Sequence, residues 1–236
     1  MSTPTSCPRI GIYGTDAVDL SEKRGCALWP AGYAAAVTEA GGAPVALELP
    51  RPGSDWEDAL EGIEGVLFLG NGPATGWRAT QEERLCRWCQ ERGLPLLAVD
   101  YGMHVVNVAF GGTLHVDLAH EVPNALQHQH SPEKGDRHAI IAVDGTRISN
   151  FYGEGEIVVN SEHKSAVAKL ARDFTVSGKA LDGVVEAIEA DAEWFALGVQ
   201  WHPASATASG LDIQLFRGLV NACRERWAKV LATCAA

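Results

Sequence analysis

The chain has little positive charge and no long apolar run. Nineteen Lys and Arg stand against thirty Asp and Glu among 236 residues, which gives a formal net charge of −11. An acidic surface repels nucleic-acid phosphates and anionic membranes, so we expect neither as a partner. No apolar run approaches the ~18 residues of a membrane span, and the opening MSTPTSCPR lacks the charged and then apolar layout of a signal peptide. These absences predict a soluble cytoplasmic protein.

Cysteine is sparse, with six in the whole chain and no disulfide-rich spacing. Reduced thiols are therefore expected. Cys86 and Cys89 form a CxxC, but it lies inside the helical pattern QEERLCRWCQERG. A redox or zinc role needs a strand-to-helix turn or a second cysteine pair, and this motif has neither. We predict small core residues on one face of a helix.

Apolar runs and helical patterns alternate through the first half of the chain. Strands are expected at 9–14, 43–49, 65–70 and 95–99, with helices at 31–39, near 56–60 and at 80–93. Such alternation predicts a mainly parallel sheet with helices on both faces.

Strands at closer spacing follow in the second half, expected at 138–143, 144–149, 155–160, 174–180, 183–190 and 195–201. An amphipathic helix at 211–231 closes the chain. We predict a single α/β domain over residues 1–236.

The stretch PLLAVDYGMHVVNVAFGGTLHVDL, residues 95–118, has the layout of a buried strand, a tight turn and a helix. This layout holds the catalytic nucleophile at the top of many α/β sheets. Here the residue at the tip of the turn is Asp100, neither Ser nor Cys. Asp tolerates the strained backbone of such a turn better than most residues, which is a structural reason for its presence.

Four segments occur in an order and spacing that resemble a known family. They are NVAFGGTLHVDL after the turn, VNSEHKSAV at 159–167, DGVVEAIE at 182–189 and FALGVQWHP at 195–203. The chain resembles the class I glutamine amidotransferase-like superfamily, in the γ-glutamyl-γ-aminobutyrate hydrolase (peptidase C26) branch. The resemblance implies a flavodoxin-like α/β fold and a small-molecule substrate or ligand, and we expect no cofactor.

In that family the tight turn between strand and helix, called the elbow, carries a Cys that attacks a γ-glutamyl amide. A His moves the proton, and a Glu two residues beyond orients the His. The family elbow reads Gly-Ile-Cys-Arg-Gly, so the resemblance places Asp100 at the Cys and Tyr101 at the Arg. The family's Trp-His-Pro-Glu reads Trp-His-Pro-Ala here, which retains His202 but puts Ala204 at the orienting Glu. The family's Gly-Gly-x-Asp loop corresponds to residues 70–73, which read Gly-Asn-Gly-Pro in this chain.

These departures leave several hypotheses. Asp100 and His202 form an acid/base pair in a repurposed, cofactor-independent enzyme acting on a small carboxylate- or amide-bearing compound of secondary metabolism. Alternatively, the protein is a catalytically silent ligand-binding or regulatory protein, a residual γ-glutamyl amide hydrolase, or a metal protein in which Asp100 joins histidines. In the first and preferred hypothesis, the residues expected to contact the substrate are Tyr101, His163, Asn71, Gly70, His104 and Trp201.

Five further histidines fall between residues 115 and 138. His128 and His130 are expected on one strand face, a spacing that metal sites use. No Cys or Glu accompanies them in sequence, so we predict exposed or hydrogen-bonded histidines and no metal site. The oligomeric state is left open, with a homodimer as one possibility.

Overall fold

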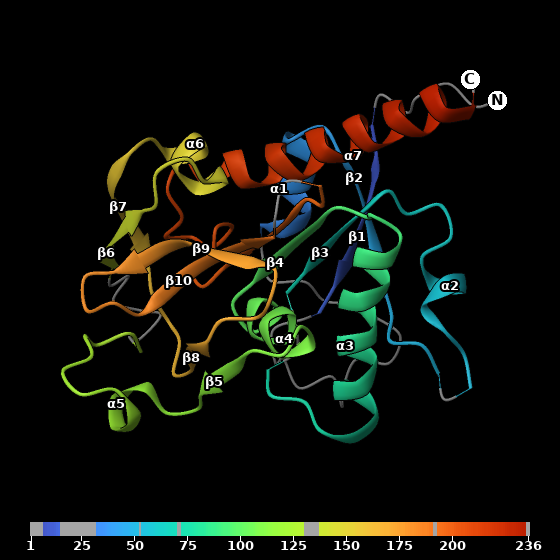
Figure 1. Ribbon diagram of the computed structural model, residues 1–236. Coiled ribbons are helices and arrows are strands. Elements are labelled where there is room, and N and C mark those ends of the chain that lie inside the picture. Colours follow the sequence, from blue (N-terminus) through green and yellow to red (C-terminus); the bar gives the residue numbers. More distant parts are fainter. Residues whose placement is uncertain are drawn as a thin grey trace.

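Residues 7–14, 32–51, 53–69, 72–129, 137–190 and 193–234 are described by the computed structural model, drawn in Figure 1. Eleven strands of these residues form one sheet. No helix in the described ranges is long and apolar enough to cross a membrane.

The first half of the chain, together with β11 from near its end, builds a parallel sheet. Its strands lie in the order β2-β1-β3-β4-β11, and each neighbouring pair is parallel. In sheets of this order, ligands bind beyond the carboxyl ends of the strands, where the strand order reverses. The strands are β1 (Arg9–Tyr13), β2 (Ala43–Leu47), β3 (Gly65–Phe68), β4 (Leu96–Val99) and β11 (Ala196–Val199).

Antiparallel strands extend the sheet beyond β11 in the order β10-β9-β6-β7, while β8 pairs with both β10 and β5. This part lies beside the parallel strands in Figure 1. A short helix, α5 (Leu118–Glu121), follows β5. The strands are β5 (Thr113–His115), β6 (Arg137–Ala142), β7 (Gly155–Asn160), β8 (Ala166–Lys169), β9 (Phe174–Ala180) and β10 (Val185–Ala190).

The strand predicted at 144–149 is wrong. This segment forms a turn and the start of helix α6 (Arg147–Tyr152). The side chain of Thr146 accepts a hydrogen bond from the backbone N–H of Ser149, which satisfies one of the free donors at the helix start. The N-cap threonine therefore directs a short sequence with strand-like alternation into a helix.

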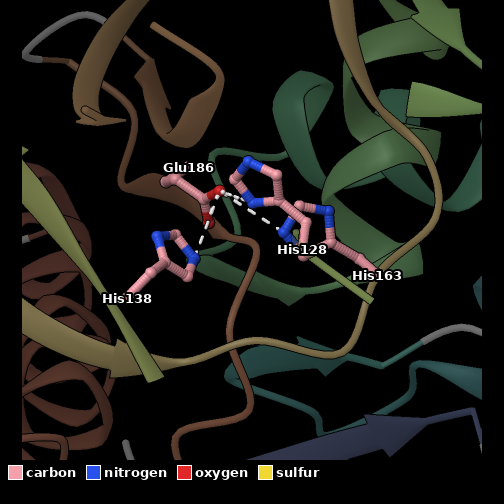
Figure 2. A group of neighbouring side chains, drawn as sticks. All are labelled: His128, His138, His163 and Glu186. Carbon is pink, nitrogen blue, oxygen red and sulfur yellow. Dashed lines mark ion pairs between the residues drawn. The ribbon is translucent and has the colours of Figure 1, made fainter. Parts of the chain in front are cut away.

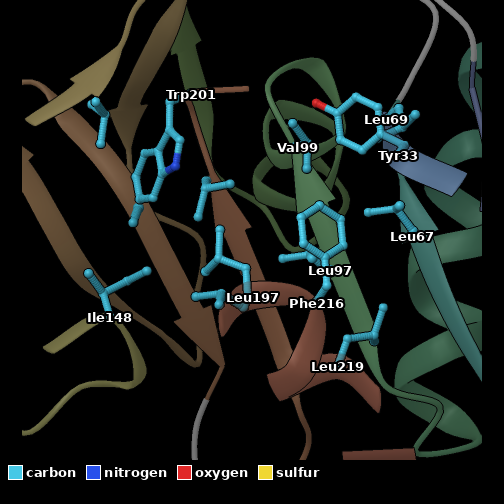
Figure 3. Close-up of a cluster of buried hydrophobic side chains, with 14 of the residues drawn as sticks. Tyr33, Leu67, Leu69, Leu97, Val99, Ile148, Leu197, Trp201, Phe216 and Leu219 are labelled. Atoms are coloured by element: carbon cyan, nitrogen blue, oxygen red, sulfur yellow. The ribbon is translucent and has the colours of Figure 1, made fainter. Parts of the chain in front are cut away.

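Helices cover both faces of the parallel strands (Figure 1). α1 (Tyr33–Glu39) and α7 (Ile213–Cys234) share one apolar core, and α2 (Trp56–Ala59), α3 (Gly76–Glu91) and α4 (Tyr101–Ala109) share the other. Figure 3 shows the first core, in which Leu67 and Leu97 pack with Phe216. Successive strand residues point to opposite faces, so each strand supplies both cores. The predicted α/β fold class is confirmed.

The CxxC lies on α3, and both thiols are fully buried. Burial raises the pKa of the Cys86 and Cys89 thiols well above the ordinary value, and it raises the pKa of Cys223 on α7 to about 12. These surroundings agree with the predicted core role, because a reactive thiol needs exposure and a lowered pKa.

We expect a thiol reagent such as iodoacetamide to modify exposed Cys7 in the native protein and to leave Cys86, Cys89 and Cys223 unmodified. The thiolate is the reacting species, and a thiol pKa of about 12 lowers its fraction roughly a thousandfold near pH 8. Peptide mass mapping before and after denaturation measures each thiol separately. Native labelling of Cys86 or Cys89 at the rate of Cys7 would contradict the packing of α3.

Candidate functional site

A strained turn places Asp100 at the carboxyl edge of the sheet. β4 ends at Val99 and α4 begins at Tyr101, so Asp100 alone makes the turn, with φ 48° and ψ −112°. Its N–H donates to the carbonyl of Val199 (2.8 Å), and its carbonyl accepts from the N–H of His104 (3.2 Å). A positive φ at a residue other than glycine costs on the order of 1–3 kcal/mol, and such strain is concentrated at functional sites.

His202 faces this turn from the segment that follows β11. Its Nε2 lies 3.9 Å from Oδ2 of Asp100, and both side chains are about one quarter exposed (24% and 27%). Asn160 fixes the backbone of His202, because its side chain accepts from the N–H (2.9 Å) and donates to the carbonyl (3.0 Å). The structure thus brings together the two residues that the sequence predicts as an acid/base pair.

Gln200 connects Asp100 to His104. Its Nε2 donates to Oδ1 of Asp100 (2.6 Å), and its Oε1 accepts from Nε2 of His104 (2.7 Å). Burial lowers the pKa of His104, with the nearby Asp100 charge acting in the opposite direction, so a neutral ring with its proton on Nε2 fits this bond. The sequence prediction missed Gln200, because an amide at the end of an apolar strand carries no distinctive signal.

A cavity of about 270 Å³ opens beside the turn, between α3, α4 and β5. Tyr101 and His104 form part of its wall, and the Tyr101 hydroxyl accepts from the N–H of Ala74 (2.8 Å). Glu82 adds a buried carboxyl whose pKa is raised by burial. Most of the lining residues are apolar. The full lining is Pro73, Ala74, Ala79, Glu82, Glu83, Tyr101, His104, Val105, Val108, Leu114, Val116 and Ser165. Apolar walls with a few polar groups are typical of small-molecule sites.

The other predicted contacts have different outcomes. Gly70 and Asn71 lie outside the described residues, as does His130. Trp201 is fully buried in the core shared with α7, so its proposed role as a substrate contact is corrected to a packing role. His163 is also buried, and its Nε2 lies 3.3 Å from Oε1 of Glu186. An imidazole enclosed beside a buried carboxylate is not free to contact a substrate.

The histidines at 115–138 divide into two groups. His120 is exposed and pairs with Asp117, and His115 is partly exposed beside Glu121. His128 and His138 are instead buried, and both rings lie against Glu186 together with His163. These three histidines and Glu186 are the one group of described residues arranged so that they could hold a metal ion.

The loop after His202 is anchored by the buried carboxylate of Asp212. It accepts hydrogen bonds from Tyr152 (2.5 Å), Trp201 (3.3 Å) and the N–H of Ser209 (2.7 Å). Burial nevertheless raises the pKa of Asp212, although the three donors oppose this shift. The folded protein therefore holds this proton at a pH where the unfolded chain has released it.

Because the folded state binds this proton more tightly, the stability that Asp212 contributes should fall as pH rises from about 4 through the raised pKa. The quantity to compare is the free energy of unfolding of the wild type minus that of Asp212→Asn. Within that window the difference should change by up to about 1.4 kcal/mol per pH unit. Urea denaturation of both proteins at several pH values measures it. A difference that does not depend on pH, or that grows with pH, would contradict the assigned direction.

Comparisons with known proteins agree with this architecture. The peptidase C26 family profile matches residues 8–204. A Mycobacterium tuberculosis protein named "Putative glutamine amidotransferase" is 34% identical over 215 residues, which cover 82% of this chain and 67% of that protein. The γ-glutamyl-γ-aminobutyrate hydrolase of Escherichia coli is 30% identical over 222 residues, covering 84% and 87%.

The fold also matches a solved structure. The crystal structure of a Thermoplasma acidophilum protein described as a putative GMP synthase component superposes with a TM-score of 0.67 at 14% identity, over 96% of this chain and 98% of that one. This likeness supports the fold alone. The profile match and the identity to curated relatives establish the family, so the chain belongs to the peptidase C26 family of glutamine amidotransferase-like proteins.

Proposed function

We propose that Asp100 stands where this family has its nucleophilic cysteine, and that the protein uses Asp100 and His202 as an acid/base pair. The substrate would be a small carboxylate- or amide-bearing metabolite. The observation that carries the proposal is the 3.9 Å approach of the His202 ring to the Asp100 carboxylate at the strained turn. A positioned carboxylate and imidazole can remove a proton from one atom and deliver it to another.

Acyl transfer through Asp100 is a poor alternative. A carboxylate that attacks an amide must form a mixed anhydride while an amine leaves, whereas a thiolate is a strong nucleophile and leaves readily from a thioester. Ala204 also cannot orient His202 as a glutamate at that position would. Isomerisation, elimination, decarboxylation and hydration need no such covalent step.

The two carboxylate oxygens of Asp100 have different surroundings. Oδ1 accepts the hydrogen bond from Gln200, and Oδ2 is the oxygen closer to His202. Gln200 therefore fixes the carboxylate and leaves Oδ2 facing the imidazole. Asp100 and His202 do not line the cavity beside Tyr101, so this cavity would hold only an apolar part of the substrate that extends away from the pair.

The test begins with ligand binding. Glutamine, γ-glutamyl-γ-aminobutyrate and succinate are screened for a rise in melting temperature of the wild type. Compounds that bind are incubated with enzyme in D₂O, and proton NMR follows both deuterium incorporation and new products. We expect Asp100→Asn to slow these reactions by about a thousandfold or more while binding is retained. His120→Ala changes an exposed histidine outside the site and should react like the wild type.

One observation favours a second candidate, a protein that binds a ligand without turning it over. Among the described residues, no hydrogen bond to the His202 ring is found, and the Asp100 carboxylate is 3.9 Å away. A general base is normally oriented by a third group. Ligand binding that is equal in wild type and Asp100→Asn, with no exchange or product in either, would support this candidate and exclude the enzyme.

A further inference from the structure

Three imidazoles and one carboxylate converge in a second cluster, as Figure 2 shows. His138 comes from β6, Glu186 from β10, and His163 from the segment between β7 and β8. His128 lies in the segment after α5, which a bridge between Gln129 and Glu162 joins to the segment of His163. The four side chains are at most 8% exposed. Four distant parts of the sequence thus deliver metal-ligand side chains to one enclosed point.

The distances fit a small coordination sphere. Oε1 of Glu186 lies 3.2 Å from Nδ1 of His128, 3.6 Å from Nε2 of His138 and 3.3 Å from Nε2 of His163. Ligand atoms about 2.0–2.2 Å from a tetrahedral metal are roughly 3.3–3.6 Å from one another. One ligand atom from each residue lies within 4.8 Å of all the others, so the group is close to coordination geometry.

The opposite nitrogen of each ring already has an acceptor. Nε2 of His128 lies 2.9 Å from Oδ2 of Asp182, and Nδ1 of His163 lies 3.0 Å from the carbonyl oxygen of Ser165. Nδ1 of His138 lies 3.3 Å from its neighbour's carbonyl. Since carbonyl and carboxylate oxygens only accept, each of these nitrogens carries the proton. This is the outer arrangement that metal-binding histidines adopt, and it leaves the inner nitrogen with a free lone pair.

Within the described residues, the three inner nitrogens and both oxygens of Glu186 have no hydrogen-bond partner. Lone pairs that face a carboxylate in a buried site repel it, and buried polar atoms without partners are costly. Protonating all three rings would instead enclose three like charges. A single divalent cation would instead bind the three inner nitrogens and one oxygen of Glu186 without any added proton.

We propose that His128, His138, His163 and Glu186 bind a divalent transition-metal ion, with Zn²⁺ as the best fit to three nitrogens and one oxygen. The ion's two positive charges balance the carboxylates of Glu186 and Asp182. Because four protein ligands fill a tetrahedral site and none is exposed, the ion is structural, with no open position for a substrate.

The metal would link β6 and β10 to the two segments that carry His128 and His163. The carbonyl of His128 accepts hydrogen bonds from Ser161 Oγ (2.7 Å) and from the N–H of His163 (3.1 Å). On the other side, the carbonyl of Glu186 accepts from the N–H of Gln200 (2.8 Å), the residue that holds Asp100. The ion would therefore stabilise the antiparallel strands. Of these, β10 carries Glu186 and is separated from β4, which leads into the turn at Asp100, by β11 alone. This inference does not depend on the proposed function.

The experiment measures metal content of the whole chain, purified without an affinity tag that binds metals. Elemental analysis should find about one zinc ion per wild-type chain after gel filtration. Stripping with a chelator should lower the melting temperature, and added Zn²⁺ should restore it. Glu186→Gln and His163→Gln should retain less than about one tenth of the metal. Glu189→Gln, a carboxylate of the same strand that bonds to Arg147, serves as the control and should keep it.

A second measurement covers the case in which these variants do not fold. Co²⁺ added to stripped wild-type protein should give the intense visible absorption of a tetrahedral site, and Zn²⁺ should displace it. Wild-type protein that takes up neither ion would overturn the proposal. So would metal binding that Glu186→Gln leaves unchanged, or a weak Co²⁺ spectrum typical of six-coordinate surface binding.

Discussion

Hydrolysis of γ-glutamyl-γ-aminobutyrate by the unaltered protein is expected to be about 10⁴–10⁶-fold slower than by the E. coli relative. The expected loss follows from the side chain at the turn, because a carboxylate cannot supply the thiolate that forms and releases an acyl-enzyme. The two proteins align over most of both chains, which makes the relative a suitable reference. Release of free glutamate at equal enzyme concentration measures both rates.

Asp100→Cys separates the loss of sulfur from the other departures. In the proposed correspondence with the family's motifs, Ala204 and the segment 70–73 also differ, so we expect the variant to recover only a small part of the missing rate. An acyl adduct in the intact mass after rapid quenching would show that the new thiol attacks. Turnover by the wild type within about tenfold of the relative would contradict the loss of acyl transfer.

Gly102→Ala is expected to destabilise the protein by about 3 kcal/mol or more, at or beyond the upper end of overpacking effects. Gly102 lies in the first turn of α4, and a Cβ there would lie 2.1 Å from the carbonyl oxygen of Phe68 in β3. Backbone atoms cannot rotate away, so α4 must shift from the sheet and take Asp100 with it. Helix propensity alone predicts the opposite, a gain of about 1 kcal/mol for alanine.

Gly210→Ala is the matched control, because a Cβ at Gly210 meets nothing within 4 Å. We expect its free energy of unfolding to stay within about 0.5 kcal/mol of the wild type. Urea denaturation of the three proteins compares them directly. Equal stability of Gly102→Ala and wild type would mean that α4 does not approach β3 as closely as the structure shows.

The sequence predicts the parallel half of the fold and the elbow well. The run from Pro95 to Val99 is continuous and apolar, and the Asp-Tyr-Gly that follows leaves one residue to make the turn, so local pattern and tertiary structure agree. His202 is recognisable from its motif after the last strand. The strand predicted at 144–149 is wrong because Thr146 caps a helix there. Its local hydrogen bond to Ser149 is not revealed by the strand-like alternation of the sequence.

The buried histidine cluster could not be predicted from spacing. Glu186 lies far along the chain from His138, and sheet pairing between β10, β9 and β6 brings them together. A search for a carboxylate near the histidines in sequence therefore misses it. Gln200 is missed for a related reason. It follows β11, and its role depends on hydrogen bonds to Asp100 in the turn after β4 and to His104 on α4.

The proposed function depends on Asp100 and His202 acting together, and a double-mutant cycle tests this most directly. Rates of deuterium exchange into a bound compound are compared for wild type, Asp100→Asn, His202→Ala and the double variant. We predict that each single change removes nearly as much activity as both, as in other catalytic groups that act as a unit. Losses that add independently, or a wild type that binds the compound but exchanges no proton, would contradict the assigned pair.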